Sequence, residues 1–408
     1  MVYILKEPVD DSKGIIIFRE KNILESNNML LKKQMRRLKD KYIIVYFWAR
    51  FQEEVKSIPF VDAHFAHPCS VKKFNTEQHR IKMHDMQFVP DYFENLNLPK
   101  RWDLLCIATA SKNKNLHKLL KTIKMAIDEQ NDFTACLIVP RPEKLKGGNW
   151  DKKFFEMYEN ELTEDQKGNI DLYTPLRSEA SIQPIPKEFL PYLYNSAKFF
   201  TLFSENEGGP KVIAEALMCG TPIIVPSSFT GGINAYLDES NTYKFFSLNE
   251  AKNMFISIKM NHKEYEFNPD YLTDKLSASQ SAERLENRFE EIFKQMDIRY
   301  KGSIKKDGLD SKLSHHKPTI PEIYRRNPAR GELGSVTAAY KYIKYYIFKD
   351  TCNVYTITYE FILLDLPYRI LRFIEYIIRF VDKFVPFDVY KTSKLIYFKL
   401  KNQQNKFH

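Results

Sequence analysis

The sequence predicts an α/β protein in which helices join parallel strands, with a helical extension at the C-terminal end. Two observations support this prediction. From Trp102 to about residue 296, apolar runs of strand length alternate with amphipathic runs of helical period. Repeats of strand, helix and strand form parallel sheets with right-handed crossovers. Beyond about residue 320 the chain becomes dense in aromatic, lysine and arginine residues instead.

The length of 408 residues suffices for two or three domains, and the hydrophobic fraction of 43% is that of a globular protein. Changes in composition predict the boundaries. We expect a short N-terminal α/β domain over 1–100, a second α/β domain over 101–298, a linker rich in Lys, Ser, Asp, Gly and His over 299–320, and a basic aromatic helical extension over 321–408.

The first hundred residues contain apolar runs of strand length separated by one helical stretch. The expected strands are 2–5, 15–18, 42–48 and, weakly, 87–89, and the expected helix is 28–39. The region after Trp102 has longer runs. Its expected strands are 103–110, 133–140, 170–175, 198–204 and 221–226, and its expected helices are 115–130, 187–197, 211–219 and a long closing helix over 271–296.

Cysteine usage and hydropathy indicate a cytosolic location. The five cysteines are scattered, with no CxxC or metal-type spacing, and free thiols fit a reducing compartment. No secretory signal and no membrane-spanning stretch is expected. The net charge of +10 fits a polyanionic partner, an anionic membrane surface or ordinary solubility. Nucleic acid is the least favoured partner, because no nucleic-acid-binding motif is present.

The extension combines aromatic residues with cations at helical intervals. Arg369, Arg372, Arg379 and Lys383 are incompatible with a spanning helix but suit one that lies at a membrane surface. Two interpretations stay open at about even odds: residues 336–408 bind an anionic membrane surface, or they pack on the core as a further helical layer.

The stretch "SENEGGPKVIAEALMCGTPIIVP", residues 204–226, carries the strongest site signal. It follows a strand, so Ser204 should lie at the carboxyl edge of a parallel sheet, where such sheets bind ligands. Gly208 and Gly209 let backbone amides approach an anion at the start of a helix. Pro210 suits the first helical position and Gly220 the position after the helix end.

Two carboxylates flank this glycine pair. A carboxylate accepts hydrogen bonds, so Glu215 could hold two neighbouring hydroxyls such as those of a ribose, and Glu207 could meet another polar part of the same ligand. The alternative is that Glu215 is a solvent-facing helix residue and that the glycines only turn the chain.

The whole stretch resembles the signature of the group 1 (family 4) retaining glycosyltransferases, which have the GT-B fold with two Rossmann-like domains. The matching residues are Ser204, Glu207, Gly208, Pro210 and Glu215. The resemblance covers about residues 102–296 and is specific over 190–232. It implies a nucleotide-sugar donor, with Glu215 on the ribose and with Glu207 and the two glycine amides on the sugar and diphosphate.

The resemblance also implies two cations that stabilise the leaving diphosphate. Lys114 matches the family's lysine, whereas the arginine position falls on Thr109, so Lys112 or Arg141 would have to compensate. Family members are generally metal-independent, and retention is usually drawn as front-face attack with the donor phosphate as base. We therefore expect no metal and no cofactor.

The N-terminal region is shorter than the family's acceptor domain. His64 and His67 could contact donor sugar or acceptor, or could be ordinary structural histidines. The leading prediction is a cytosolic glycosyltransferase in surface polysaccharide synthesis, peripheral on the inner membrane face, with a glycan or lipid-linked acceptor. The alternative is a non-catalytic sugar-nucleotide-binding or assembly subunit, which Thr109 and the short N-terminal region favour.

Overall fold

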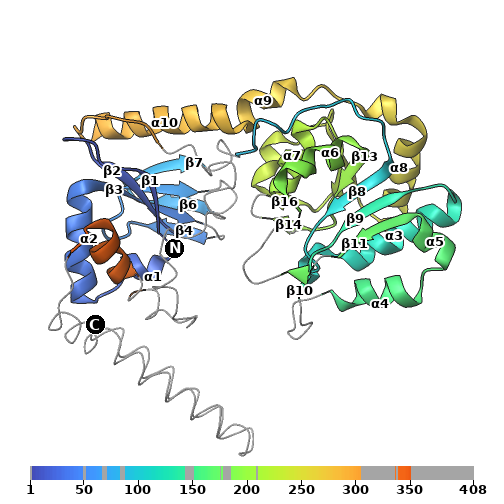
Figure 1. The fold of residues 1–408 in the computed structure, drawn as a ribbon, viewed down its shortest axis with the longest axis horizontal. Coiled ribbons are helices and arrows are strands. Elements are labelled where there is room, and N and C mark those ends of the chain that lie inside the picture. Colours follow the sequence, from blue (N-terminus) through green and yellow to red (C-terminus); the bar gives the residue numbers. More distant parts are fainter. Residues whose placement is uncertain are drawn as a thin grey trace, which may run out of the picture.

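The computed structural model describes residues 2–48, 52–66, 71–82, 88–142, 151–174, 176–177, 185–207, 210–304, 336 and 339–350. These residues form two α/β lobes, each with a largely parallel sheet, which confirms the predicted fold class (Figure 1). We call them the first and second lobe in chain order.

The first lobe has a five-stranded sheet in the order β1-β2-β3-β5-β7. Only β1 runs antiparallel to its neighbour. The strands are β1 (Val2–Lys6), β2 (Gly14–Phe18), β3 (Tyr42–Trp48), β5 (Ala63–Ala66) and β7 (His79–Lys82).

The connections between strands of the first sheet contain strands as well as helices. Helices α1 (Lys21–Leu24) and α2 (Met29–Lys41) join β2 to β3, but two further strands, β4 (Gln52–Lys56) and β6 (Val71–Asn75), lie in the next two crossovers and pair with each other in parallel. These short polar strands carry no long apolar run, so the sequence pattern did not indicate them. The weak strand predicted at 87–89 is reduced to one bridge between Val89 and Ser277.

The second lobe has a six-stranded, all-parallel sheet in the order β11-β9-β8-β13-β15-β17. In chain order this is 3-2-1-4-5-6, the Rossmann order, with a reversal between its first and fourth strands, β8 and β13. Its strands are β8 (Trp102–Ile107), β9 (Ala135–Ile138), β11 (Ile170–Tyr173), β13 (Ala197–Thr201), β15 (Ile223–Pro226) and β17 (Thr242–Phe245).

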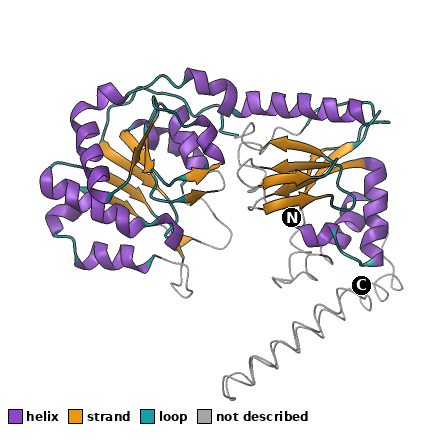
Figure 2. Cartoon of the chain, turned by 180° about the vertical axis from the view of Figure 1, so that it is seen from behind, coloured by secondary structure: helices purple, strands orange, loops and turns teal. Residues whose placement is uncertain are grey.

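Helices cover both faces of this second sheet (Figure 2). Helix α3 packs against α4 and α8, while α6 packs against α7. The five helices are α3 (Leu116–Glu129), α4 (Lys152–Asn160), α6 (Leu190–Asn195), α7 (Lys211–Met218) and α8 (Leu248–Asn261). A short α5 (Glu164–Gly168) precedes β11. Neither α4 nor α5 was predicted, because their stretch looked merely polar.

The long closing helix predicted over 271–296 is wrong in one respect: it is two helices, α9 (Asp270–Leu276) and α10 (Ala278–Gln295). Ser277 between them is extended, and its side chain caps α10 by accepting from the backbone N–H of Gln280 at 3.3 Å. The backbone of Val89 bonds on both sides of this break, to Leu276 and Ala278. Tertiary pairing therefore interrupts the helical pattern.

Helix α10 packs on the first lobe, along one face of its sheet (Figure 1). Leu285, Phe289, Ile292 and Phe293 are fully buried there. Residues 299–304 of the predicted linker follow the same face, where Ile304 is buried. On the other face, residues Val336 and 339–350 pack beside α2, with Tyr340, Tyr342 and Ile343 buried.

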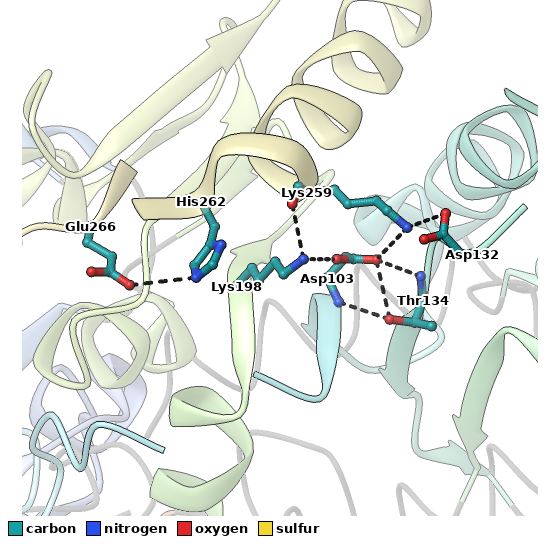
Figure 3. Close-up of polar contacts among 7 residues, drawn as sticks. All are labelled: Asp103, Asp132, Thr134, Lys198, Lys259, His262 and Glu266. Atoms are coloured by element: carbon teal, nitrogen blue, oxygen red, sulfur yellow. Dashed lines mark hydrogen bonds and ion pairs between the residues drawn. The ribbon is translucent and has the colours of Figure 1, made fainter. Parts of the chain in front are cut away.

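A polar cluster lies at the amino-terminal edge of the second sheet (Figure 3). The buried carboxylate of Asp103 pairs with Lys198 at 2.7 Å and accepts from the backbone N–H of Thr134 at 2.9 Å. Lys259 lies 3.8 Å from Asp103 and pairs with Asp132 at 2.5 Å. The cluster joins the starts of β8 and β13 to α8, and its charges pair with one another. It lies at the end of the strands opposite to their carboxyl edge.

Candidate nucleotide-sugar site

The candidate site lies where the strand order of the second sheet reverses. The chain leaves β8 and β13 at their carboxyl ends in opposite directions, and this divergence is where doubly wound sheets bind ligands. The loop after β8 carries Lys114, in the short 3-10 helix η3 (Lys112–Lys114). The loop after β13 carries Ser204 and Glu207. The fold thus brings together residues that the sequence separates widely.

Lys114 and Glu207 form an ion pair across this point, from Nζ to Oε1. Their side chains are only 18% and 12% exposed, so bulk water screens the pair weakly. The neighbouring Asn115 donates from Nδ2 to the carbonyl of Phe203 at 3.1 Å, which ties the start of α3 to the end of β13. The loop after β8 is therefore anchored to the loop that carries the motif.

The Glu207 loop is also held by backbone pairing. Strand β14 (Asn206–Glu207) pairs in parallel with β16 (Thr230–Gly231), and the N–H of Thr230 donates to the carbonyl of Glu205 at 2.8 Å. A Cβ on Gly231 would lie 2.7 Å from the carbonyl oxygen of Glu207, so this close approach requires glycine. Both strands lie on the side of the second lobe that faces the first (Figure 1).

Glu215 is buried, with 1% of its surface exposed. The alternative of a solvent-facing helix residue is therefore wrong. Its Oε2 accepts from the hydroxyl of Tyr194 at 2.9 Å, and its Oε1 lies 3.8 Å from Lys211 Nζ. Burial and the nearby carboxylate raise the pKa of Tyr194 well above its ordinary value, so the phenol stays a hydrogen-bond donor. These two contacts fix the position of the Glu215 carboxylate within the second lobe.

Ser204 contributes a buried hydroxyl at the same sheet edge. The residue is fully buried, and within the described ranges its Oγ has no hydrogen-bond partner. Buried polar atoms are nearly always satisfied, so this hydroxyl is an exception at the sheet edge.

The remaining sequence-derived candidates divide into three groups. Thr109 lies beside Ser111, oxygen to oxygen at 3.3 Å, and Lys112 is exposed. Pro210 lies one position before the first residue of α7 and not at its first position as predicted, whereas Gly220 follows the helix end with a φ of +70°, as predicted. Gly208, Gly209, His67 and the side chain of Arg141 lie outside the described residues.

His64 is fully buried in β5 of the first lobe. Its Nδ1 accepts from the indole N–H of Trp48 at 2.9 Å, so Nε2 carries the proton and donates to Gln78 Oε1 at 2.6 Å. Burial lowers the pKa of His64, consistent with a neutral ring. Both ring nitrogens are engaged within the protein, as in the structural alternative weighed from the sequence.

Sequence reasoning missed Tyr194 and Asn115. Tyr194 lies in a helix predicted only as a lead into the motif, and the signal for it is general: a buried tyrosine hydroxyl needs a partner. Asn115 directly precedes α3, but its side chain does not cap that helix. Its amide donates to the carbonyl of Phe203 instead. Over the described ranges no three His, Cys, Asp or Glu side chains gather as metal ligands would.

No family model and no curated protein matched the chain. Among solved structures, the pneumococcal O-GlcNAc transferase GtfA, in complex with UDP and GlcNAc, is 12% identical with a TM-score of 0.43, covering 64% of this chain and 55% of its own. Anabaena HepE, in complex with UDP, is 12% identical with a TM-score of 0.46, covering 68% and 78%.

Sucrose-phosphate synthase of Thermosynechococcus elongatus is 14% identical with a TM-score of 0.44, covering 65% of this chain and 71% of its own. The chain spans little more than half the length of GtfA.

Proposed function

We propose that this protein is a glycosyltransferase that moves a sugar from a nucleotide-sugar donor to a glycan or lipid-linked acceptor with retention. The observation that carries the proposal is the Lys114–Glu207 pair at the strand-order reversal, beside buried Glu215. The motif in which these residues stand resembles that of group 1 retaining glycosyltransferases. Their placement at one sheet edge fits a bound nucleoside diphosphate.

Each residue has a role in this reaction. The bond from the anomeric carbon to the diphosphate breaks while the acceptor oxygen bonds to the same face of that carbon, and the acceptor proton passes to the leaving phosphate. Lys114, together with backbone amides of the glycine loop, stabilises the charge that develops on the diphosphate. Glu215 accepts from the ribose hydroxyls, while Tyr194 fixes its carboxylate. Ser204 and Glu207 contact the sugar and phosphates.

A thermal-shift panel tests donor binding. UDP-, GDP- and ADP-sugars are compared on the wild type and on Glu215→Ala, with Glu205→Ala as the matched control because Glu205 is exposed in the same loop region. We expect one nucleotide class to raise Tm, since a ligand that binds only the folded state stabilises it. The shift should vanish in Glu215→Ala and persist in Glu205→Ala. No shift with any donor would contradict the proposal.

One observation favours the second candidate function, a non-catalytic sugar-nucleotide-binding or assembly subunit. The position of the family's arginine is Thr109, an uncharged residue whose hydroxyl contacts the neighbouring Ser111. With fewer cations at the leaving group, a donor could bind without reacting. Hydrolysis of the donor identified in the panel separates the two: release of free sugar supports the enzyme, and tight binding without release supports the subunit.

We further propose that the enzyme works in the cytoplasm, on surface polysaccharide, at an anionic membrane. The base of the extension docks on α2: Arg37 makes a bidentate pair with Asp350 at 2.7 and 3.0 Å and lies over the ring of Phe348. Lys33, Lys41 and Lys344 surround the same two residues. These cations form a basic surface from which residues 351–408 continue. None of the helices in the described ranges could span a membrane.

Co-sedimentation with vesicles tests this surface. Phosphatidylcholine vesicles with and without phosphatidylglycerol are incubated with the full chain and with Lys33→Gln/Lys41→Gln/Lys344→Gln. Each cation near an anionic surface contributes about 1 kcal/mol, so the variant should bind anionic vesicles at least about tenfold more weakly. Lys121→Gln/Lys152→Gln/Lys153→Gln removes the same charge from the second lobe and should bind normally. Equal binding by all three chains would exclude this surface.

A further inference from the structure

Asp151 is a buried carboxylate next to the candidate site that the proposed function leaves unused. It directly precedes α4 and is 3% exposed. Its Oδ2 accepts from the backbone N–H of His117 at 3.1 Å and from His117 Nδ1 at 2.9 Å. Its Oδ1 accepts from the backbone N–H of Phe154 at 3.3 Å. One side chain therefore binds three N–H groups from two helices.

Asp151 acts as a cap for α3 as well as for α4. The first N–H groups of a helix lack partners within it, and the residue before the helix usually supplies one. Asn115 stands in that position of α3 but directs its amide to Phe203, and its backbone is left-handed, with a φ of +50°. The acceptor for the first turn of α3 comes from Asp151 instead.

The backbone of Asp151 holds the other end of the same loop. Its N–H donates to the carbonyl of Ala110 at 2.9 Å, and the N–H of Ala110 donates to the carbonyl of Pro140 at 3.3 Å. The loop from Ala110 to His117, which contains Lys114, is thus fixed at both ends by one residue. Between them, Asn115 adds a hydrogen bond to the carbonyl of Phe203, in the loop after β13.

We propose that Asp151 is a positioning residue that holds Lys114 against the diphosphate of the nucleotide ligand. This inference rests on the proposed donor site. A cation stabilises a phosphate group most when its position is already fixed in the unliganded protein. Ordering a mobile lysine side chain on binding costs conformational entropy, which reduces the gain. Loss of the Asp151 contacts frees the first turn of α3 and with it the turn that carries Lys114.

The variants are chosen to preserve the cap of α4. Asp151→Asn and Asp151→Ser both place good capping oxygens before that helix. Asparagine has one acceptor oxygen where aspartate has two, so it cannot serve Phe154 and His117 together. Serine is too short to reach both. If one variant fails to fold, the other carries the test.

The test compares affinity for a nucleoside diphosphate with affinity for its nucleoside. Titration calorimetry is run with the UDP/uridine, GDP/guanosine and ADP/adenosine pairs on the wild type, Lys114→Ala, Asp151→Asn, Asp151→Ser and Lys114→Ala/Asp151→Asn. We expect Lys114→Ala to weaken diphosphate binding about tenfold and leave nucleoside binding unchanged. The Asp151 variants should show the same selective loss, about three- to tenfold, and the double variant no more than Lys114→Ala alone.

The outcomes separate two failures. If Lys114→Ala loses diphosphate affinity but both Asp151 variants keep the wild-type ratio of diphosphate to nucleoside affinity, Asp151 is only structural and this inference is wrong. Losses that add up in the double variant would also contradict it, because Asp151 would then act independently of Lys114. If Lys114→Ala itself leaves the ratio unchanged, the assignment of the donor site fails instead.

Discussion

The buried His64 has both ring nitrogens engaged: its neutral ring accepts from Trp48 and donates to Gln78 at the same time. Protonation would turn the accepting Nδ1 into a second donor facing the indole N–H. The native first lobe therefore disfavours the charged ring, which agrees with the lowered pKa of His64.

The pH dependence of stability follows from this shift. An unfolded histidine has a pKa of about 6.5, above the lowered value in the folded protein, so below this pH the unfolded chain binds a proton that the folded chain does not. The contribution of neutral His64 to the free energy of unfolding is fully present above about pH 6.5. It falls with decreasing pH, by at most about 1.4 kcal/mol per pH unit, until the pH is below the pKa of His64 in the folded protein.

We expect His64→Gln to flatten this dependence, because glutamine keeps one acceptor and one donor but does not titrate. The measurement is urea unfolding of both proteins at several values between about pH 7 and pH 5. The difference between their free energies of unfolding should shrink as the pH falls. Parallel curves for the two proteins would mean that the titration of His64 does not contribute to the pH dependence of stability.

At the scale of elements, the break between α9 and α10 shows where a sequence pattern stops being informative. The periodicity of residues 271–296 is continuous, and nothing local demands an interruption at Ser277. The interruption comes from Val89, whose backbone pairs on both sides of Ser277. A cap forms there because serine in an extended conformation can accept from the N–H of Gln280.

Ser277→Ala should therefore destabilise the protein by about 1 kcal/mol, the usual cost of losing a cap. Gln280→Ala is the control, since the Gln280 side chain is exposed in the first turn of the same helix and only its backbone N–H bonds to Ser277. Thermal and urea unfolding of the two variants measure the difference. Equal stabilities of Ser277→Ala and its control would show that the side-chain cap contributes nothing measurable to the stability of the protein.

The same limit applies to the candidate site. The motif indicated Glu207 and Glu215, because the spacing of its glycines, proline and carboxylates is local, whereas Lys114 was indicated by the family resemblance. The contacts made by Tyr194 and Asp151 could not be predicted, since each depends on how two helices pack against each other. Similarly, the long apolar strands of both sheets were predictable, whereas β4 and β6 owe their form to pairing with each other.

At the scale of the whole molecule, the two lobes are built differently along the chain. The second lobe is continuous: all six strands of its sheet lie between residues 102 and 245. The first lobe is discontinuous, because α10 covers one face of its sheet and residues 339–350 pack on the other (Figure 1). The sheet of the first hundred residues has a complete core only when these later segments are present.

This construction predicts how fragments behave. Residues 88–277 should fold alone, whereas residues 1–87 should not, because burial of Leu285, Phe289, Ile292 and Phe293 is lost. Each such side chain contributes about 1.5–3 kcal/mol, and the sum is comparable with the whole stability of a small domain, about 5–15 kcal/mol. Co-expression of residues 278–350 with 1–87 should restore a cooperative unfolding transition, followed by circular dichroism. A cooperative transition in 1–87 alone would show that its sheet needs neither cover.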